Sequence, residues 1–293
     1  MNICKIRPVF FSPVSQTRDI VLRIAHFLSD TLSDGTLPIE PVDFTLPAAR
    51  DRITKSDTGV LQFSKEELVV FGTPTYAGRV PNKALPFVQE LFRGDNTPCI
   101  SVVTFGNRNF DSSLTELAEE LGRNGFQVFA AGAFVCEHVF TSELAPGRPD
   151  DFDLKEIDDF ATAIADKLKN ENIYPENIAN KSPSPCVIKN GEPVAPYYTP
   201  LGADGEPAKF LKAKPLTHSD KCDNCGICVS VCPLGSINPE EVSDVPGVCI
   251  KCQACVKKCP TGAKYFDDEA FLSHVTYLKE HFGGTRHENA TFL

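Results

Sequence analysis

The sequence lacks several features, and each absence excludes a class of protein. It has no run of 18 apolar residues, so we expect no membrane-spanning helix. Its first residues hold no long apolar segment with a cleavage site, so we expect no targeting segment and a cytoplasmic location. No G-x-G-x-x-G follows an expected strand, which argues against direct use of a nicotinamide dinucleotide. The net charge of −10, without runs of like charge, argues against nucleic acid as a partner.

The totals describe an ordinary globular protein. The chain of 293 residues is long enough for one full domain plus a small one. Its apolar content of 42% and charged content of 23% are typical of globular domains. An acidic carrier of this kind can associate with basic patches on other proteins.

The first 170 residues alternate between apolar runs and amphipathic segments. The pattern predicts buried strands at residues 3–11, 37–44, 68–71, 99–105 and 126–134. It predicts helices between and after them, at residues 17–31, 81–93, 112–123 and 153–168. Strands separated by helices of this length favour a parallel sheet covered on both faces, here a flavodoxin-like α/β fold with strand order 2-1-3-4-5. Pro38 and Pro41 place the second strand at an edge.

The remaining segments are less regular. Residues 45–66 are expected to be irregular, and residues 171–215 form a proline-rich linker between a domain at 1–170 and a second at 216–293. Tyr197-Tyr198 and Phe210-Leu211 are candidate anchors of this linker to a domain surface. A helix is predicted at residues 269–282, and residues 283–293 are expected to be frayed.

Eight of the twelve cysteines form two runs with identical spacing, C-x2-C-x2-C-x3-C-P. Three thiolates spaced two residues apart fit one face of a [4Fe–4S] cubane, and a fourth from elsewhere completes its ligation. Zinc sites typically use two C-x2-C pairs, and a disulfide framework would need an oxidising compartment. The sequence therefore predicts two iron–sulfur clusters bound by Cys222, Cys225, Cys228, Cys232, Cys249, Cys252, Cys255 and Cys259.

Three loops at the carboxyl ends of the expected strands are rich in Ser, Thr, Gly and Asn. The first, residues 12–17, runs into a helix start, where free N–H groups and the helix dipole favour a phosphate. It resembles the flavodoxin phosphate loop, with Ser12, Gln16 and Thr17 at matching positions. Val14 lacks the expected hydroxyl, and Ser15 replaces the expected glycine. A simple helix cap at Ser15 or Gln16 is the alternative.

As a whole, the chain resembles the family of flavodoxin–ferredoxin fusion proteins, in which a flavodoxin-like domain precedes a small α+β bacterial ferredoxin domain. The resemblance implies that one cluster takes Cys222, Cys225, Cys228 and Cys259, and the other takes Cys249, Cys252, Cys255 and Cys232. It also implies FMN as a cofactor, with its ring wrapped by the loops after the third and fourth strands. The FMN-binding residues expected are Ser12, Ser15, Gln16, Thr17, Pro74, Thr75, Tyr76, Ala77, Gly78, Thr104, Gly106, Asn107, Arg108 and Phe110. Among them, Asn107 is a candidate for the ring's polar edge and Tyr76 or Phe110 for its face.

Two smaller interpretations concern other residues. Cys136, Glu137 and His138 follow the fifth strand and can be either proton carriers beside a flavin or structural residues. The N–H groups near Gly226, Gly235 and Gly262 are candidates for hydrogen bonds to cluster sulfurs.

The expected function is electron transfer between FMN, two [4Fe–4S] clusters and redox protein partners. One alternative is a ferredoxin-type carrier or complex subunit whose flavodoxin-like half lacks FMN. Another is a flavin-dependent reductase of a small acceptor, so whether the protein is an enzyme stays open. The donor, the acceptor and the oligomeric state are not encoded in any recognisable motif.

Overall fold

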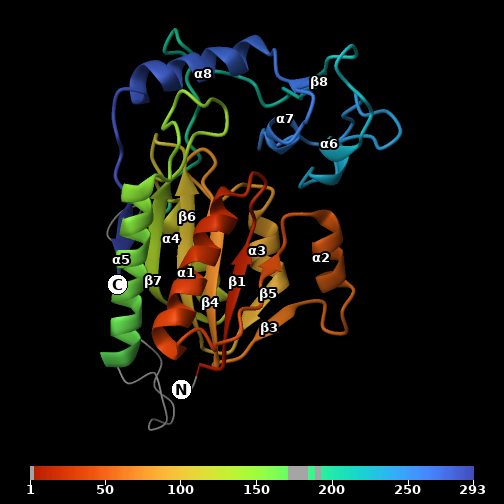
Figure 1. Cartoon of the computed structure of the whole chain (residues 1–293). Helices are drawn as coiled ribbons and strands as arrows, with labels where there is room; N and C mark the ends of the chain where they lie inside the picture. Colours follow the sequence, from red (N-terminus) through yellow and green to blue (C-terminus); the bar gives the residue numbers. More distant parts are fainter. Residues whose placement is uncertain (1–2, 171–183, 189–192) are drawn as a thin grey trace.

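A computed structural model of the chain describes residues 3–170, 184–188 and 193–293. Parts of the predicted linker, residues 171–183 and 189–192, therefore lie outside the described residues. The first half is a twisted sheet with helices on both faces, and the smaller second half sits above the carboxyl ends of the strands (Figure 1). Within the described residues, no helix combines the length and apolar character needed to cross a bilayer.

The main sheet has the strand order β10-β7-β6-β4-β1-β2. The five of its strands that come first in the sequence are parallel to one another. These strands are β1 (Lys5–Phe10), β2 (Val42–Asp43), β4 (Glu67–Pro74), β6 (Thr97–Phe105) and β7 (Phe126–Val135). Taken alone they run 2-1-3-4-5, as predicted, with the short β2 at the edge. A sixth strand, β10 (Ala290–Phe292), pairs antiparallel with β7. The expectation that residues 283–293 are frayed was therefore wrong.

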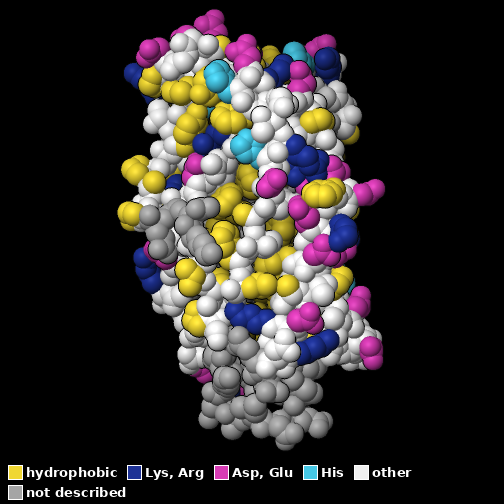
Figure 2. Space-filling model, turned by 90° about the vertical axis from the view of Figure 1, so that its left-hand side faces the viewer, with side chains coloured by type: hydrophobic (Ala, Val, Ile, Leu, Met, Phe, Trp, Pro, Cys, Tyr) yellow, Lys and Arg dark blue, Asp and Glu magenta, His cyan; other side chains and the backbone are white. Residues whose placement is uncertain are grey.

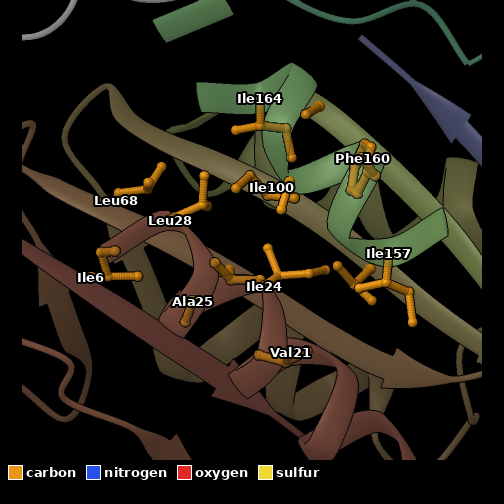
Figure 3. Packing of buried hydrophobic residues seen from close by; sticks show 14 of the residues in the cluster. Ile6, Val21, Ile24, Ala25, Leu28, Leu68, Ile100, Ile157, Phe160 and Ile164 are labelled. Carbon is orange, nitrogen blue, oxygen red and sulfur yellow. The ribbon is translucent and has the colours of Figure 1, made fainter. Parts of the chain in front are cut away.

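Four helices cover the sheet and bury both of its faces. They are α1 (Gln16–Ser33), α3 (Leu85–Leu91), α4 (Ser113–Arg123) and α5 (Asp151–Asn170). Alternating residues of β4 serve the two cores: Leu68 and Val70 face α1 and α5, whereas Val69 and Phe71 face α3 and α4. Figure 3 shows part of the first core, where Ile24 of α1 lies toward Ile157 of α5 and Leu28 of α1 lies near Ile100 of β6.

Three predicted segments differ in detail from the structure. The helix expected at 81–93 begins only at Leu85, and its last residues form β5 (Phe92–Gly94) instead. The strand expected at 37–44 narrows to Val42–Asp43 because Pro38 and Pro41 have no N–H to donate. Residues 45–66, expected to be irregular, contain α2 (Pro47–Thr54) and β3 (Leu61–Phe63), and β3 pairs with β5.

The second half is built mainly from loops around short elements. These are β8 (Leu216–Thr217), α6 (Ile227–Ser230), α7 (Ala254–Lys257) and β9 (Lys264–Tyr265), followed by α8 (Glu269–Phe282). From α8 the chain descends along the main sheet to β10 (Figure 1). The C-terminal residues thus tie the second half to the first.

The described part of the linker packs on both halves. Tyr198 N–H donates to Ala77 O at 2.8 Å, and the Tyr197 hydroxyl donates to Val80 O at 2.9 Å. Phe210 is buried against Phe271 of α8, with ring centroids 5.6 Å apart. These residues are anchors as predicted, but Leu211 is 92% exposed and is not one.

Charged side chains of both signs are interspersed over the face shown in Figure 2, and hydrophobic side chains gather along its middle. The negative net charge is thus not gathered into a single acidic field on this face.

Candidate functional site

The eight cysteines of the two runs surround two separate cavities. One cavity is lined by Cys222, Cys225, Cys228 and Cys259, which we call the outer set. The other is lined by Cys232, Cys249, Cys252 and Cys255, which we call the inner set. In each set three sulfurs come from one run and the fourth from the other run. Among the described residues, no three Cys, His, Asp or Glu side chains converge as they would on a single metal ion. Sulfurs spread around a cavity fit a larger inorganic core.

The local backbone explains how each run wraps its cavity. The short helices α6 and α7 start after Gly226 and Gln253, whose φ angles of 72° and 62° turn the chain sharply. N–H groups then point at sulfur: Ser236 N lies 3.2 Å from Cys232 Sγ, and Ala263 N lies 3.2 Å from Cys259 Sγ. Such hydrogen bonds stabilise negative charge on a thiolate.

The expectation of sulfur-bonding N–H groups near the glycines is confirmed at Gly235 and Gly262, where the residue after each glycine is the donor. Gly235 N–H donates to Cys232 O, and Gly262 N–H donates to Cys259 O, so neither bonds a sulfur. Both residues have positive φ, 60° and 65°, which glycine adopts without steric cost. They close the turns that bring the next N–H, that of Ser236 or Ala263, onto the sulfur.

The inner set is more buried than the outer set. Cys252 and Cys255 are 7% and 9% exposed, whereas Cys225 is exposed and Cys222 and Cys259 are partly so. Burial, followed by the nearby Cys249 sulfur, raises the pKa of Cys255 to about 12. Without a cation these thiols stay protonated, but iron binds the thiolate. The donor set therefore fits a cationic iron–sulfur core.

A cavity of about 540 Å³ lies between the two halves, which we call the rim cavity. Its volume is in the range of roughly 300–1,000 Å³ that is usual for cofactor sites. Six of the predicted FMN residues line it: Thr75, Tyr76, Ala77, Gly78, Gly106 and Arg108. Residues 82–83, 105, 109 and 138–140 add to its wall, and parts of the linker, of residues 248–251 and of α8 complete it. Sequence reasoning did not assign these last segments to the site because no motif marks them.

The loops after β4 and β6, residues 75–79 and 106–110, which we call the rim loops, leave no room for a side chain at Gly78 or Gly106. A Cβ on Gly106 would lie 2.3 Å from a ring carbon of His138, and a Cβ on Gly78 would lie 2.2 Å from the Asp111 carboxylate. Arg108 forms an ion pair with Asp111 and lies 4.1 Å above the Tyr198 ring. The wall of the cavity is therefore held by side chains from three segments.

The other predicted FMN residues lie outside the cavity lining. Pro74 and Thr104 are paired neighbours at the ends of β4 and β6, and Phe110 packs on Phe105 with centroids 5.4 Å apart. Asn107 is 2% exposed, and its amide donates to Phe282 O at 2.9 Å and to Thr285 O at 2.8 Å. The expectation that this side chain faces a flavin edge was therefore wrong, because it binds the C-terminal segment.

The loop at 12–17 lies beside the cavity without lining it. Thr17 Oγ1 is 2.8 Å from Thr104 Oγ1, and Gln16 Nε2 donates to Glu137 O at 2.8 Å, so the loop contacts both neighbouring strand ends. Ser15 adopts φ 76°, the conformation that glycine favours at this position. Among the hydrogen bonds of the described residues, none uses the N–H of Gln16 or Thr17. These two donors at the start of α1 fit a phosphate.

Cys136, Glu137 and His138 have distinct surroundings. Cys136 lies in the core with 1% exposure, and Glu137 forms an ion pair with Lys257 at 2.9 Å. Burial, followed by the charges of His274 and Lys257, lowers the pKa of His138 to about 3. A histidine that stays neutral near pH 7 is a poor proton carrier, so these observations favour the structural interpretation.

The second half is docked firmly onto the first. Arg50 of α2 donates to Pro233 O at 2.6 Å, and Lys279 of α8 pairs with Glu143 at 2.8 Å. Arg148, which pairs with Asp153, also donates to His287 O at 2.6 Å. The rim cavity and the two cysteine sets are therefore held in a fixed arrangement.

Comparison with known proteins agrees with the cysteine pattern. Residues 215–238 and 242–265 match the family model described as a 4Fe-4S binding domain. No curated protein sequence matches the chain.

Solved structures similar to the first half include flavodoxins. One is a flavodoxin from the domain Archaea, with 14% identity over 56% of this chain and 99% of that chain, at a TM-score of 0.38. Flavodoxin 2 from Bacillus cereus has 18% identity over 56% of this chain and 99% of that chain, at a TM-score of 0.39. The rubredoxin oxygen:oxidoreductase of Desulfovibrio gigas has 18% identity over 58% of this chain and 37% of that chain, at a TM-score of 0.35. The fold of the first half is defined by its own strand order.

The strand order defines the first half as a flavodoxin-like α/β fold, and the matched segments define the second half as a 4Fe-4S binding domain. The chain therefore has the architecture of a flavodoxin–ferredoxin fusion.

Proposed function

We propose that the protein transfers electrons between FMN in the rim cavity, a [4Fe–4S] cluster in the inner set, a second cluster in the outer set, and partner proteins. When bound, the flavin supplies a centre that holds one or two electrons, whereas each cluster holds one. The protein would thus connect carriers of different electron number.

The observation that carries this proposal is a shared wall. Val248, Cys249 and Ile250 line both the rim cavity and the cavity of the inner set. Electron transfer weakens steeply with distance, so two redox centres separated by one wall are well placed to exchange electrons. Tyr76 lies in the same region, where burial and the neighbouring Cys252 and Cys249 sulfurs raise its pKa well above the usual value.

Exposure gives the proposed route a direction. The inner set is buried beside the rim cavity, and the outer set includes the exposed Cys225. A partner protein would approach the outer set more closely than the inner one. We therefore place the exchange with partners at the outer cluster.

The residues of the rim loops would bind and orient the flavin rather than perform bond chemistry. The free N–H groups of Gln16 and Thr17 would hold its phosphate. The backbone at Thr75–Gly78 and Gly106–Arg108 would contact the ring, and the linker with Tyr198 would exclude water from it.

Anaerobic purification with iron, sulfide and flavin quantified tests the proposal. We expect about eight iron, about eight sulfide and about one FMN per chain. Cys225→Ser should lower the iron content by about half, because it removes a ligand from the outer set alone. Unchanged iron in that variant would contradict the assignment of the outer set.

The second candidate function is an iron–sulfur carrier without flavin. The observation that favours it is the loop at 12–17, in which Val14 lacks a hydroxyl and no residue lines the rim cavity. Protein with full iron content but without flavin, even after incubation with FMN, would establish this alternative.

A further inference from the structure

Buried charged side chains in this protein fall into two groups. One group, all in the flavodoxin-like half, is paired: Glu67 with Arg7 at 2.9 Å, Glu116 with Arg79, and Arg148 with Asp153. These pairs follow the usual rule that a buried charge has a counter-charge. Three other buried cations in the described part of the chain break this rule. They are Arg50, Lys251 and Lys264, which are 6%, 8% and 3% exposed.

Arg50 comes from α2 of the first half and reaches the inner set. Its guanidinium donates to Pro233 O at 2.6 Å, to Thr45 O at 2.6 Å and to Phe44 O at 2.9 Å. Its face lies 4.2 Å from the centre of the Phe87 ring. Every contact is to an uncharged group, and Pro233 itself lines the inner cavity next to Cys232.

Lys251 and Lys264 are held in the same manner. The Lys251 ammonium donates to Leu211 O and to Cys249 O, the latter at 3.1 Å, and the residue lines the rim cavity. The Lys264 ammonium donates to Val242 O, and the residue lines the outer cavity. None of the three cations forms an ion pair with a carboxylate of the described residues. Asp51, Asp268 and Glu241 act on them only from a distance.

The three cations are distributed along the proposed electron route. Lys251 lies between the rim cavity and the inner set, and Arg50 lies on the α2 side of the inner set. Lys264 lines the cavity of the outer set. The unpaired positive charges thus concentrate where the cysteines gather.

We propose that Arg50, Lys251 and Lys264 are the fixed counter-charges of the two clusters and raise the cluster reduction potentials. This inference rests on the proposed function. Four thiolates outweigh the positive charge of the iron–sulfur core, so each site is a net anion, and reduction adds a further negative charge. A buried cation stabilises the reduced form more than the oxidised form. Net charge and nearby hydrogen bonds are known levers on such potentials.

The test is a potentiometric titration of the complete, anaerobically purified protein, followed by electron paramagnetic resonance. Arg50→Gln removes the charge beside the inner set. We expect the one-electron equilibrium constant for reduction of one cluster to fall about tenfold, which lowers its potential by about 59 mV. The potential of the other cluster should shift less. Arg50→Lys keeps the charge and should restore most of the wild-type potential. Lys209→Gln removes an exposed cation and should change neither potential.

The conservative variant separates charge from positioning. Equal shifts in Arg50→Lys and Arg50→Gln, or wild-type potentials in a fully loaded Arg50→Gln, would overturn the inference. If Arg50→Gln loses its iron, Lys251→Gln decides by the same criterion of a lowered inner potential. If Arg50→Gln and Lys251→Gln both lose iron while Arg50→Lys retains it, the result supports a need for the positive charge. If Arg50→Lys loses its iron as well, the result overturns the inference. Wild-type protein without iron would instead refute the proposed function.

Discussion

Asn107→Ala should release the C-terminal segment from the flavodoxin-like half. The buried side chain of Asn107 makes three hydrogen bonds to this segment: to Phe282 O at 2.9 Å, to Thr285 O at 2.8 Å, and from His287 N at 3.2 Å. Each neutral hydrogen bond contributes about 1 kcal/mol, so their loss costs about 3 kcal/mol. Because 1.4 kcal/mol is a factor of ten, local opening should become about 100-fold more frequent.

Hydrogen exchange read by mass spectrometry measures this opening directly. Residues 283–293 should exchange about 100-fold faster in Asn107→Ala, while β1 keeps its wild-type rate. Asn109→Ala is the matched control, because Asn109 is exposed in the same loop and its side chain accepts a hydrogen bond only from Asp111 N among the described residues. Unchanged exchange of the C-terminal segment, accompanied by loss of FMN, would refute the reasoning and return Asn107 to the flavin site.

The remaining predictions concern stability, pH and the rim cavity. Phe92→Ala should lower stability by about 3–5 kcal/mol in thermal unfolding, because its ring is fully buried 5.0 Å from that of Phe44; a loss below about 1 kcal/mol would contradict this. The pKa of His138 in the folded protein is lowered from 6.5 to about 3. Between these pH values the imidazole is protonated in the unfolded chain but not in the folded protein, so stability falls as the pH falls. The loss of stability between about pH 6.5 and 3 should therefore be shallower in His138→Gln, by at most about 1.4 kcal/mol per pH unit. Identical pH profiles of the two proteins would exclude this role of His138. Gly106→Ala should lower FMN content without lowering iron content, because the added Cβ meets His138. Gly284→Ala, where a Cβ meets no atom within 4 Å, should leave both contents unchanged, and equal flavin loss in the two variants would contradict the steric argument.

Local patterns predicted the main elements because their signals are local. The apolar runs at 68–71, 99–105 and 126–134 are continuous, as expected for strands covered on both faces, and the structure has β4, β6 and β7 there. The period of α1 and α5 was equally clear. Residues 45–66 were misjudged because α2 is short and polar. The buried Arg50 on this helix contacts Phe44, Thr45 and Phe87 of the first half and also Pro233 of the second half.

In the candidate site, too, the residues marked by local sequence patterns were predicted, and those whose role depends on distant contacts were not. The cysteine spacing marks the eight sulfurs, and the loops that end β4 and β6 were recognisable from their small polar residues. The role of Asn107 was misassigned because its partners, Phe282 and Thr285, lie more than 170 residues away in the sequence. Lys251 and Lys264 carry no motif, and only their burial without a carboxylate partner draws attention to them.

By itself the sequence determined the class of metal chemistry and the alternation of strands and helices, because ligand spacing and hydrophobic period are properties of short segments. Only the tertiary structure decided which segments share a wall, since that depends on contacts between residues far apart in the chain. The antiparallel β10 returns the C-terminus to the sheet, α8 crosses above it, and the linker lies on the rim. Together they hold Cys249 against the rim cavity, where the proposed electron transfer takes place.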